Sequence, residues 1–287
     1  MSTVKNLIKE LLGSKYIFKI TFNFLTSKAN KIYFVNYHNT YPCNNENFFR
    51  HLEFYKEYFE IIDPKKINSI SSGNTKPQLI LTFDDGNASN FQISNILYER
   101  GISAIFAIPY NYISRSSEPT IEREISIAKS KFKIFPDLKQ EIESSSFRTS
   151  LSEHQIKKMS KMGHEISSHT CNHTRLSSKL KKSEFYYEIV ISKKLLEGVI
   201  NKKVKFFTWV GGELSSYSKN AFDLISKNYE YSLMTCNKAW SKEQSNYHIH
   251  RFNIESSFSL NKVRITLGGI YQLKYFFKRA LVDFITS

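Results

Sequence analysis

The chain has 287 residues, of which 41% are hydrophobic, 15% aromatic and 23% charged. This composition excludes a disordered or low-complexity protein and suits one large domain or two small ones. Lysine and arginine outnumber the acidic residues by 41 to 26, so an anionic partner or surface is expected, although a generally basic proteome would produce the same net charge of +15.

Three cysteines are scattered through the chain, at Cys43, Cys171 and Cys236. They form no Cys-x-x-Cys pair and no disulfide framework, which favours a reducing compartment. Lysines and a glutamate interrupt the apolar stretches near the N-terminus, so no secretory signal is expected. No run approaches the ~18 apolar residues that cross a bilayer, so we expect a cytoplasmic protein, at most peripheral at the inner face of a membrane. No basic stripe with interleaved aromatic residues is present, so nucleic acid is not an expected partner.

Residues 1–30 read as a basic amphipathic segment ahead of the main domain. A helix over 4–12 is expected to end at Gly13, and its apolar face is made of Val4, Leu7, Ile8, Leu11 and Leu12. An aromatic run flanked by lysines follows at 16–25. This run suits an anchor in the membrane interface or a helix docked on the protein's own body, and the sequence leaves both interpretations open.

The first predicted strand covers residues 32–38 and ends at His38. A helix with apolar residues at 3- and 4-residue spacing follows, and Pro64 ends it. The next strand, Leu79-Ile80-Leu81-Thr82-Phe83, is an almost unbroken apolar run, which is typical of a buried strand in a parallel sheet or barrel.

Two carboxylates follow this strand directly. Asp84 and Asp85 lie at its carboxyl end, where α/β folds place catalytic and binding residues. Gly86 permits the sharp turn that lets both side chains face one cavity. An Asp-Asp-Gly sequence by itself also opens turns and caps helices, so this pair needs support from elsewhere in the chain.

The alternation of helices and strands continues to the end of the chain. Residues 111–150 are polar and are predicted to form an excursion over the mouth of the sheet, with a short helix near 123–130. A helix that begins at Ser183 has Ser192 as the one polar member of its apolar stripe. The other predicted elements are a strand at 102–109, a helix with a capping box at Ser152 and Gln155, strands at 165–168 and 204–209, a helix near 219–227, and strands near 231–235 and 248–254. Alternation over roughly 230 residues predicts a barrel-like or doubly wound α/β domain.

His169 and His173 are four residues apart, so one helical turn or a tight loop brings the two imidazoles together. With one distant carboxylate they would make a three-ligand site that leaves coordination positions open for water and substrate, as catalytic metal sites do. A His-x-x-x-His pair alone is weak support, and its weight comes from the strand-end carboxylates upstream. Cys171 is expected to point elsewhere and is not included.

Thr82-Phe83-Asp84-Asp85-Gly86 and His169-Thr170-Cys171-Asn172-His173 resemble the first two motifs of the polysaccharide deacetylase family, carbohydrate esterase family 4, which contains the NodB-homology domain. Tyr37-His38 resembles the N-terminal segment of the permuted branch that acts on poly-N-acetylglucosamine-like polymers. The likeness covers residues 31–270 and implies an α/β fold, a distorted (β/α) barrel of about seven strands. A basic amphipathic helix is expected after it, at 271–287.

The resemblance implies that Asp85, His169 and His173 hold one divalent ion, zinc or else Co, Ni or Mn. It also makes Asp84 the general base, which takes a proton from the attacking water. In the permuted branch an N-terminal histidine protonates the departing amine, and His38 occupies the matching place. His250 is the reserve candidate for this acid.

The third family motif is altered in this chain. Residues 207–212 align with it, but Val210 replaces the usual proline and Gly211 the usual aromatic residue. Gly211 can still offer its backbone amide to an oxyanion, and Trp209 is the candidate for the wall on which a sugar stacks. Arg251 matches an arginine that recurs in the late strand of the permuted branch, and it is the third candidate for substrate binding, with a structural role as the alternative.

These observations predict a metal-dependent hydrolase that removes N-acetyl groups from N-acetylhexosamine units of a cell-envelope polysaccharide or its lipid-linked precursor. One alternative is an O-acetyl carbohydrate esterase, because the same attack cleaves esters. Another is a catalytically impaired family member that binds glycan, for which the altered third motif is the only support. Besides the glycan, the expected partner is an anionic membrane surface, contacted by residues 1–30 and by Lys274, Lys278 and Arg279.

Overall fold

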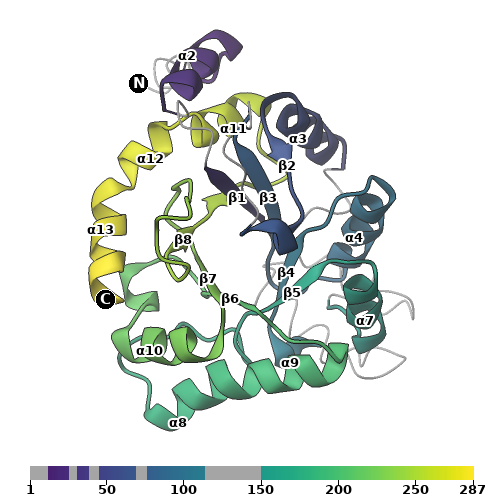
Figure 1. Ribbon diagram of the computed structural model, residues 1–287, viewed down its shortest axis with the longest axis vertical. Coiled ribbons are helices and arrows are strands. Elements are labelled where there is room, and N and C mark those ends of the chain that lie inside the picture. The colour runs from purple at the N-terminus through teal and green to yellow at the C-terminus, as the bar shows by residue number, and fades with distance from the viewer. Residues whose placement is uncertain (1–11, 26–30, 39–44, 69–75, 114–149) are drawn as a thin grey trace, which may run out of the picture.

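The computed structural model describes residues 12–25, 31–38, 45–68, 76–113 and 150–287. Parallel strands form the wall of a barrel, and helices surround it on the outside (Figure 1). The predicted distorted (β/α) barrel is therefore confirmed. The helices expected at 4–12 and 123–130 lie outside the described residues.

All strand pairs within the barrel are parallel among the described residues, and their order around the wall is β8-β7-β6-β5-β4-β3-β1-β9. A short additional strand, β2 (Glu60–Ile61), pairs with β3 beside this path. The barrel strands are β1 (Ile32–Tyr37), β3 (Gln78–Phe83), β4 (Ile105–Ile108), β5 (Glu165–Ser168), β6 (Phe206–Thr208), β7 (Tyr231–Met234), β8 (Ile249–His250) and β9 (Phe252–Asn253).

One short segment closes the barrel. Its first half, β8, pairs with β7, and its second half, β9, pairs with β1. Only Arg251 separates the two halves, so residues 249–253 act as a single strand that joins both edges of the sheet. Counted in this way the barrel has seven strands, as the sequence predicts.

Alternation along the strands sorts their side chains between two apolar clusters. Tyr33, Leu79 and Leu81 face outward into the cluster beneath the helices, whereas Phe34 and Ile80 belong to a separate cluster in the barrel interior. Because side chains alternate between faces, the interior row of β3 continues from Ile80 through Thr82 to Asp84. The interior row of the closing strand likewise continues from Ile249 to Arg251. Strand geometry thus directs a carboxylate and a guanidinium into the same interior.

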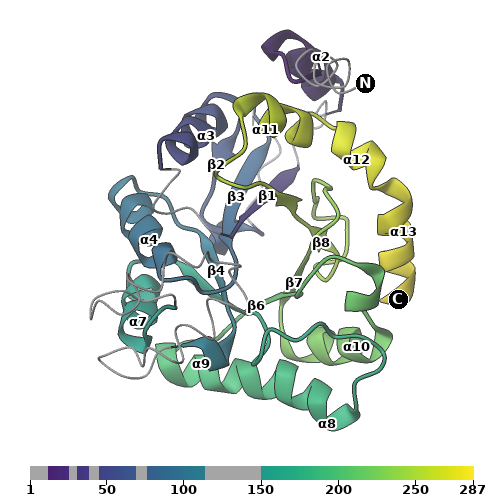
Figure 2. The ribbon, with the colours of Figure 1, turned by 180° about the vertical axis from the view of Figure 1, so that it is seen from behind.

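The helices cover the outer face of this wall, as Figures 1 and 2 show from opposite sides. They are α2 (Lys15–Leu25), α3 (Asn45–Tyr58), α4 (Ser89–Glu99), α7 (Glu153–Lys161), α8 (Lys182–Phe185), α9 (Ser192–Ile200), α10 (Lys219–Asn228), α11 (Leu260–Leu267), α12 (Ile270–Lys274) and α13 (Phe276–Ile285). Short 3₁₀ turns lie at η1 (Pro64–Lys66), η2 (Tyr110–Tyr112) and η6 (Leu214–Ser216).

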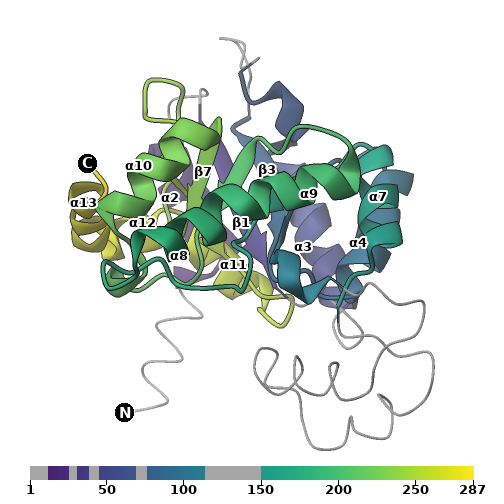
Figure 3. The same ribbon diagram turned by 90° about the horizontal axis from the view of Figure 1, so that it is seen from below.

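The long helix predicted from Ser183 is one continuous rod along the outside of the barrel (Figure 3). Its middle is a π-helical stretch, η5 (Tyr186–Ile191), between α8 and α9. Ser192, the polar member of its buried stripe, is satisfied because its hydroxyl lies 2.7 Å from the Ser168 hydroxyl and donates to the Ile189 carbonyl. The capping box at Ser152 and Gln155 is also present.

The aromatic run at 16–25 forms α2, which docks on the protein's own body. Phe18 packs against Phe54 and Tyr58 of α3 with ring centroids 5.3 and 4.9 Å apart, and Phe22 packs edge-on against Phe59 at 5.1 Å. These buried rings are part of the main core. Of the two interpretations left open for this run, intramolecular docking therefore holds for its Phe18–Phe22 face.

We expect Phe18→Ala to lower the free energy of unfolding by about 3–5 kcal/mol, because it empties a closely packed aromatic site. Tyr16→Ala on the exposed side of the same helix is the matched control and should change stability by less than about 0.5 kcal/mol. Urea unfolding curves of both variants measure this. Equal, small effects would mean that α2 is not part of the cooperative core.

Candidate active site

The candidate site lies at the carboxyl end of the barrel, where three parallel strands deliver polar residues. His38 follows β1, Asp84 and Asp85 follow β3, and His169 follows β5. Since neighbouring parallel strands end on the same side of a sheet, these residues converge at one mouth. Asp85 has a φ of +75°, an uncommon conformation that aspartate tolerates better than most residues.

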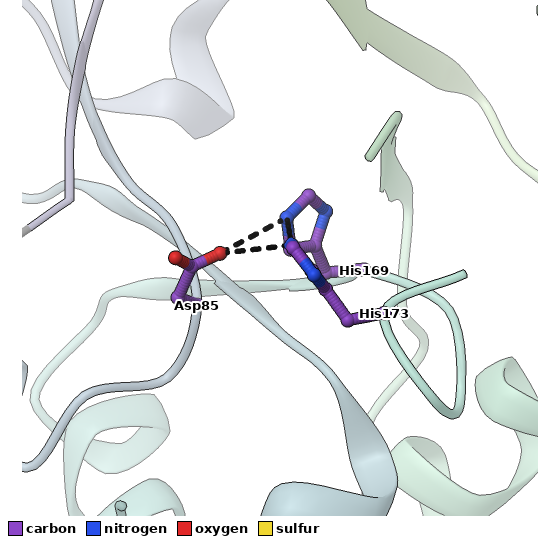
Figure 4. A group of neighbouring side chains, drawn as sticks. All are labelled: Asp85, His169 and His173. Atoms are coloured by element: carbon purple, nitrogen blue, oxygen red, sulfur yellow. Dashed lines mark hydrogen bonds and ion pairs between the residues drawn. The ribbon is translucent and has the colours of Figure 1, made fainter. Parts of the chain in front are cut away.

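Asp85, His169 and His173 point toward one another across this mouth (Figure 4). The Asp85 Oδ1 atom lies 3.4 Å from His169 Nε2 and 3.0 Å from His173 Nε2. The two Nε2 atoms are 3.1 Å apart. Of the described histidine, cysteine and acidic side chains, these three form the one group arranged to share a metal ion.

These three residues fit a divalent ion in both spacing and chemistry. Ligands at about 2.1 Å from a tetrahedral or octahedral ion are themselves roughly 3.0–3.4 Å apart, which matches the separations of the three donor atoms. His169 Nδ1 lies 2.8 Å from the Thr208 carbonyl, which can only accept a hydrogen bond. The His169 proton is therefore on Nδ1, and Nε2 keeps its lone pair for a metal.

The carboxylate of this group stays ionised, as a metal ligand must be. Burial would raise the pKa of Asp85, but the neighbouring imidazoles of His169 and His173 outweigh it and hold the pKa well below its usual range.

A buried glutamate fixes the loop that carries the two histidines. Glu188, from the π-helical stretch η5, accepts hydrogen bonds from the backbone amides of Cys171 and Asn172 at 2.8 and 2.9 Å. It also accepts from the Asn172 side-chain amide and the Thr174 hydroxyl. Cys171 is not one of the three metal-type donors. Its thiol is buried, which raises the pKa of that thiol to about 12.

Arg251 holds Asp84 in a bidentate ion pair inside the barrel. Its two terminal nitrogens donate to the two carboxylate oxygens at 2.7 and 2.8 Å, and further hydrogen bonds go to Asn36, Thr82 and the Met234 carbonyl. Burial would raise the pKa of Asp84, but the guanidinium charge outweighs it and keeps the pKa below its usual range. Asp84 is therefore an oriented, ionised carboxylate beside the metal-ligand group.

His38 forms an ion pair with Glu255, the residue two positions after β9. His38 Nδ1 lies 2.8 Å from Glu255 Oε1, and the imidazole is 38% exposed. Burial lowers the pKa of His38, but Glu255 and the charges of Asp85 and Asp84 raise it to about 9 overall. The imidazole is therefore a cation at neutral pH, and its Nε2–H is free of the Glu255 bond.

Two of the predicted substrate-binding residues are placed elsewhere. Arg251 is 1% exposed and its guanidinium is occupied by Asp84, Asn36 and Thr82, so it orients the carboxylate and does not face a substrate. Trp209 is also 1% exposed, and its Nε1 donates to Ser232 Oγ, so its ring presents no open face to a sugar. Both expectations are wrong, because Arg251 points into the barrel interior and Trp209 is buried in the outer cluster beneath the helices, against Phe207 and Tyr217.

His250, the reserve general acid, is also excluded by its position. It lies on the outer side of the closing strand, where its Nε2 is 2.9 Å from Asp283 of α13. His248 points the same way and lies 2.8 Å from the Thr286 hydroxyl. The alternation of the strand sends Arg251 inward and both histidines outward.

Gly211 lies in the exposed loop after β6, with a φ of +78°. A Cβ atom there would lie 2.8 Å from Ser216 Oγ and 2.9 Å from Arg175 Nε, so a larger residue would have to displace its neighbours. The role of its amide as an oxyanion donor stays a prediction.

Glu255, Asn36 and Glu188 were missed by the sequence analysis, although each left a signal. Glu255 directly follows the predicted strand 248–254, so the strand-end rule that selects His38 also selects it. Asn36 is the polar residue of an otherwise apolar or aromatic strand, and Glu188 is a buried acid within a predicted amphipathic helix. A polar residue at a position that the pattern predicts to be buried needs a hydrogen-bond partner, and this indicates a supporting role for such a residue.

A sequence model of the family described as polysaccharide deacetylase matches residues 71–231, which include both clustered motifs. The chain belongs to the polysaccharide deacetylase family. It is therefore a hydrolase.

Relatives of known sequence or structure agree with this assignment. The Bacillus subtilis (strain 168) protein YxkH, which is named as a candidate polysaccharide deacetylase, is 22% identical over 82% of this chain and 75% of its own. The fold is similar to that of the Streptococcus pyogenes deacetylase PplD, with a TM-score of 0.60 and 17% identity over 84% of this chain and 99% of that one. It is also similar to a de-N-acetylase from Aggregatibacter actinomycetemcomitans, with a TM-score of 0.59 and 17% identity over 83% and 100% of the two chains.

We expect Arg251→Met to lower the free energy of unfolding by about 3–5 kcal/mol, because it leaves the Asp84 carboxylate buried without its counter-charge. Adding Asp84→Asn should recover a large part of that loss, since no buried charge then remains. Arg175→Met, which removes an exposed ion pair with Glu213, is the matched control and should cost less than about 1 kcal/mol. Denaturant unfolding measures all three. Additive effects in the double variant would contradict direct coupling.

Proposed function

We propose that this hydrolase is metal-dependent and removes N-acetyl groups from N-acetylhexosamine units of a cell-envelope polysaccharide or its lipid-linked precursor. The observation that carries the proposal is the grouping of three metal-type donors with an ionised carboxylate and a charged imidazole at one barrel mouth. The description of the Aggregatibacter relative as a de-N-acetylase supports the choice of an amide substrate.

In this proposal Asp85, His169 and His173 hold the divalent ion, zinc or else Co, Ni or Mn. When bound, such an ion supplies Lewis-acid chemistry, because it acidifies water and polarises an amide carbonyl. Glu188 fixes the positions of the two histidines, because it binds the backbone of the loop between them. His169 is held in the correct tautomer by the Thr208 carbonyl.

Asp84 acts as the general base. Arg251 restrains both carboxylate oxygens and keeps the group ionised, so it can accept the proton of an attacking water through a remaining lone pair. A carboxylate that is already oriented and charged needs no rearrangement before it takes this proton.

His38 acts as the general acid, as in the branch of the family with an N-terminal Tyr-His motif. An amine is a poor leaving group unless it is protonated, and the His38 cation can donate its Nε2 proton while Glu255 holds Nδ1. Tyr37 fixes the end of β1 next to it through hydrogen bonds between its hydroxyl and Tyr55 and His51. A strong acid group of this kind suits amide cleavage more than ester cleavage.

We place the enzyme in the cytoplasm, bound to the inner face of a membrane, where a lipid-linked glycan would be within reach. Cys171 and Cys236 are free and buried, which suits a reducing compartment. Among the helices of the described residues, none combines the length and apolar character needed to cross a bilayer.

The metal site can be tested by binding and by activity together. We expect about one zinc ion per chain by elemental analysis, loss of that ion in His173→Ala and Asp85→Ala, and retention in His154→Ala, an exposed histidine on α7. Chelation should abolish the release of acetate and free amine from N-acetylated glycans, and added zinc should restore it. Acetate without new amine would indicate an O-acetyl esterase. Bound metal without either product would indicate a glycan-binding protein.

We expect His38→Ala to lower turnover on an amide roughly 10²–10⁴-fold with metal content unchanged, because the amine then leaves without its proton donor. An ester substrate should lose less, since an alkoxide depends less on the acid. Steady-state kinetics on an N-acetylated and an O-acetylated substrate measure both. Normal amide turnover in this variant would remove His38 from the mechanism.

Glu255→Gln should move the alkaline limb of the rate profile to lower pH. His38 is active while protonated, and Glu255 raises its pKa toward about 9, so losing that carboxylate lowers the pKa at which activity falls. A bound cation near Asp85 would lower this pKa in both proteins and leave the direction of the difference unchanged. Glu99→Gln, an exposed charge change on α4, is the control. An unshifted limb in Glu255→Gln would contradict the pairing.

A further inference from the structure

We propose that the outer face of α12 and α13 is a docking surface for anionic lipid headgroups. This C-terminal ridge consists of five large apolar side chains, Leu273, Phe276, Phe277, Leu281 and Phe284, which are between 49% and 80% exposed. Five of the eleven exposed large apolar or tyrosine side chains of the described residues thus fall within residues 273–284. Such a concentration marks an interaction surface.

The ridge faces outward because the opposite side of α13 is fixed to the barrel. Arg279 is buried and donates to the backbone carbonyls of Cys236 and Asn237, at 3.0 and 3.2 Å. Asp283 pairs with His250 of the closing strand. These polar side chains therefore fix the inner face of α13 to the barrel. Figures 1 and 2 both show α13 at the outer edge of the molecule with no other element beyond it.

The pattern of the ridge suits a helix that lies flat in the membrane interface. Phe277, Leu281 and Phe284 follow one another at spacings of four and three residues, so they line one side of α13. A helix of 10 residues is about 15 Å long, too short to span the ~30 Å hydrocarbon layer. Phenylalanine and leucine beside lysine are the usual composition of interfacial helices.

Charge selects an anionic lipid surface as the occupant. Lys274 and Lys278 border the ridge, each within 5.6 Å of the Tyr275 ring centroid. Asp283 is the one acidic residue between 270 and 287, and His250 already engages it. A second copy packed by two-fold symmetry on the same ridge would bring lysines against lysines, without acids to offset them.

Of the two ends of the chain predicted to contact a membrane, this assignment rests on the C-terminal one, since residues 1–11 and 26–30 lie outside the described part of the chain. Phe18 and Phe22 are buried on one face of α2, and among the side chains that the structure describes in this helix, those of 15–23, Tyr16 and Ile20 are the exposed large apolar ones. The inference is independent of the metal site and of the chemistry proposed for it.

The test is co-sedimentation of the full chain with vesicles of phosphatidylcholine alone or mixed with phosphatidylglycerol, at low and high salt. We expect binding to the anionic vesicles, weakened by salt. The ridge variant, Phe277→Ala with Phe284→Ala, should weaken binding at least about tenfold. The variant Lys274→Gln with Lys278→Gln should weaken binding on the order of tenfold and should lose the preference for anionic lipid.

Tyr98→Ala with Tyr186→Ala, exposed residues on α4 and η5, is the matched control and should bind as the wild type does. Because all substituted residues are on the surface, thermal unfolding should be unchanged, and acetate release from a free glycan should also be retained. Failure to bind anionic vesicles, or equal binding by the ridge variant, would overturn the proposal. So would loss of binding only in Tyr16→Ala with Ile20→Ala, or a dimer in solution that the ridge variant abolishes.

Discussion

The buried ion pair between Arg251 and Asp84 is the interaction on which both the barrel and its site depend. Two charges taken out of water are tolerated only with close geometry and full hydrogen bonding, and this pair has both. The guanidinium also reaches Asn36 of β1 and the Met234 carbonyl of β7. The same contacts that tie the closing strand to its neighbours therefore set the orientation and charge of the proposed general base.

Most of the fold could be predicted from local pattern. Short apolar runs alternating with amphipathic helices are enough to indicate a parallel α/β barrel, and the helices predicted from Ser152 and Ser183 are present as α7 and as the rod that begins with α8. The last strand was also found, although its role as the closure could not be, because closure depends on pairing with β1, more than two hundred positions earlier in the chain. Periodicity reports which face is buried and says nothing of distant partners.

The candidate site could likewise be predicted only in part. Strand-end position and ligand chemistry were enough to select Asp85, His169 and His173, which the structure brings together. Trp209 was assigned to substrate because the altered third motif lacks its usual aromatic residue, and Arg251 because an arginine recurs in the late strand of the permuted branch. Only the three-dimensional structure shows that both side chains are buried, Arg251 inside the barrel and Trp209 beneath the helices. Glu255 and Glu188 act through other residues, and such supporting roles depend on contacts that one sequence does not display.

The position of Arg251 near the end of the chain has a consequence for how the molecule forms. During synthesis Asp84 emerges 167 residues before its counter-charge, so a nascent chain has an open sheet edge on β1 and a carboxylate that cannot yet be buried. Docking of residues 249–253 removes both defects in one step. Barrel closure and the pairing of the proposed general base with Arg251 are thus the same folding event, and an incomplete chain lacks this pair along with the closed fold.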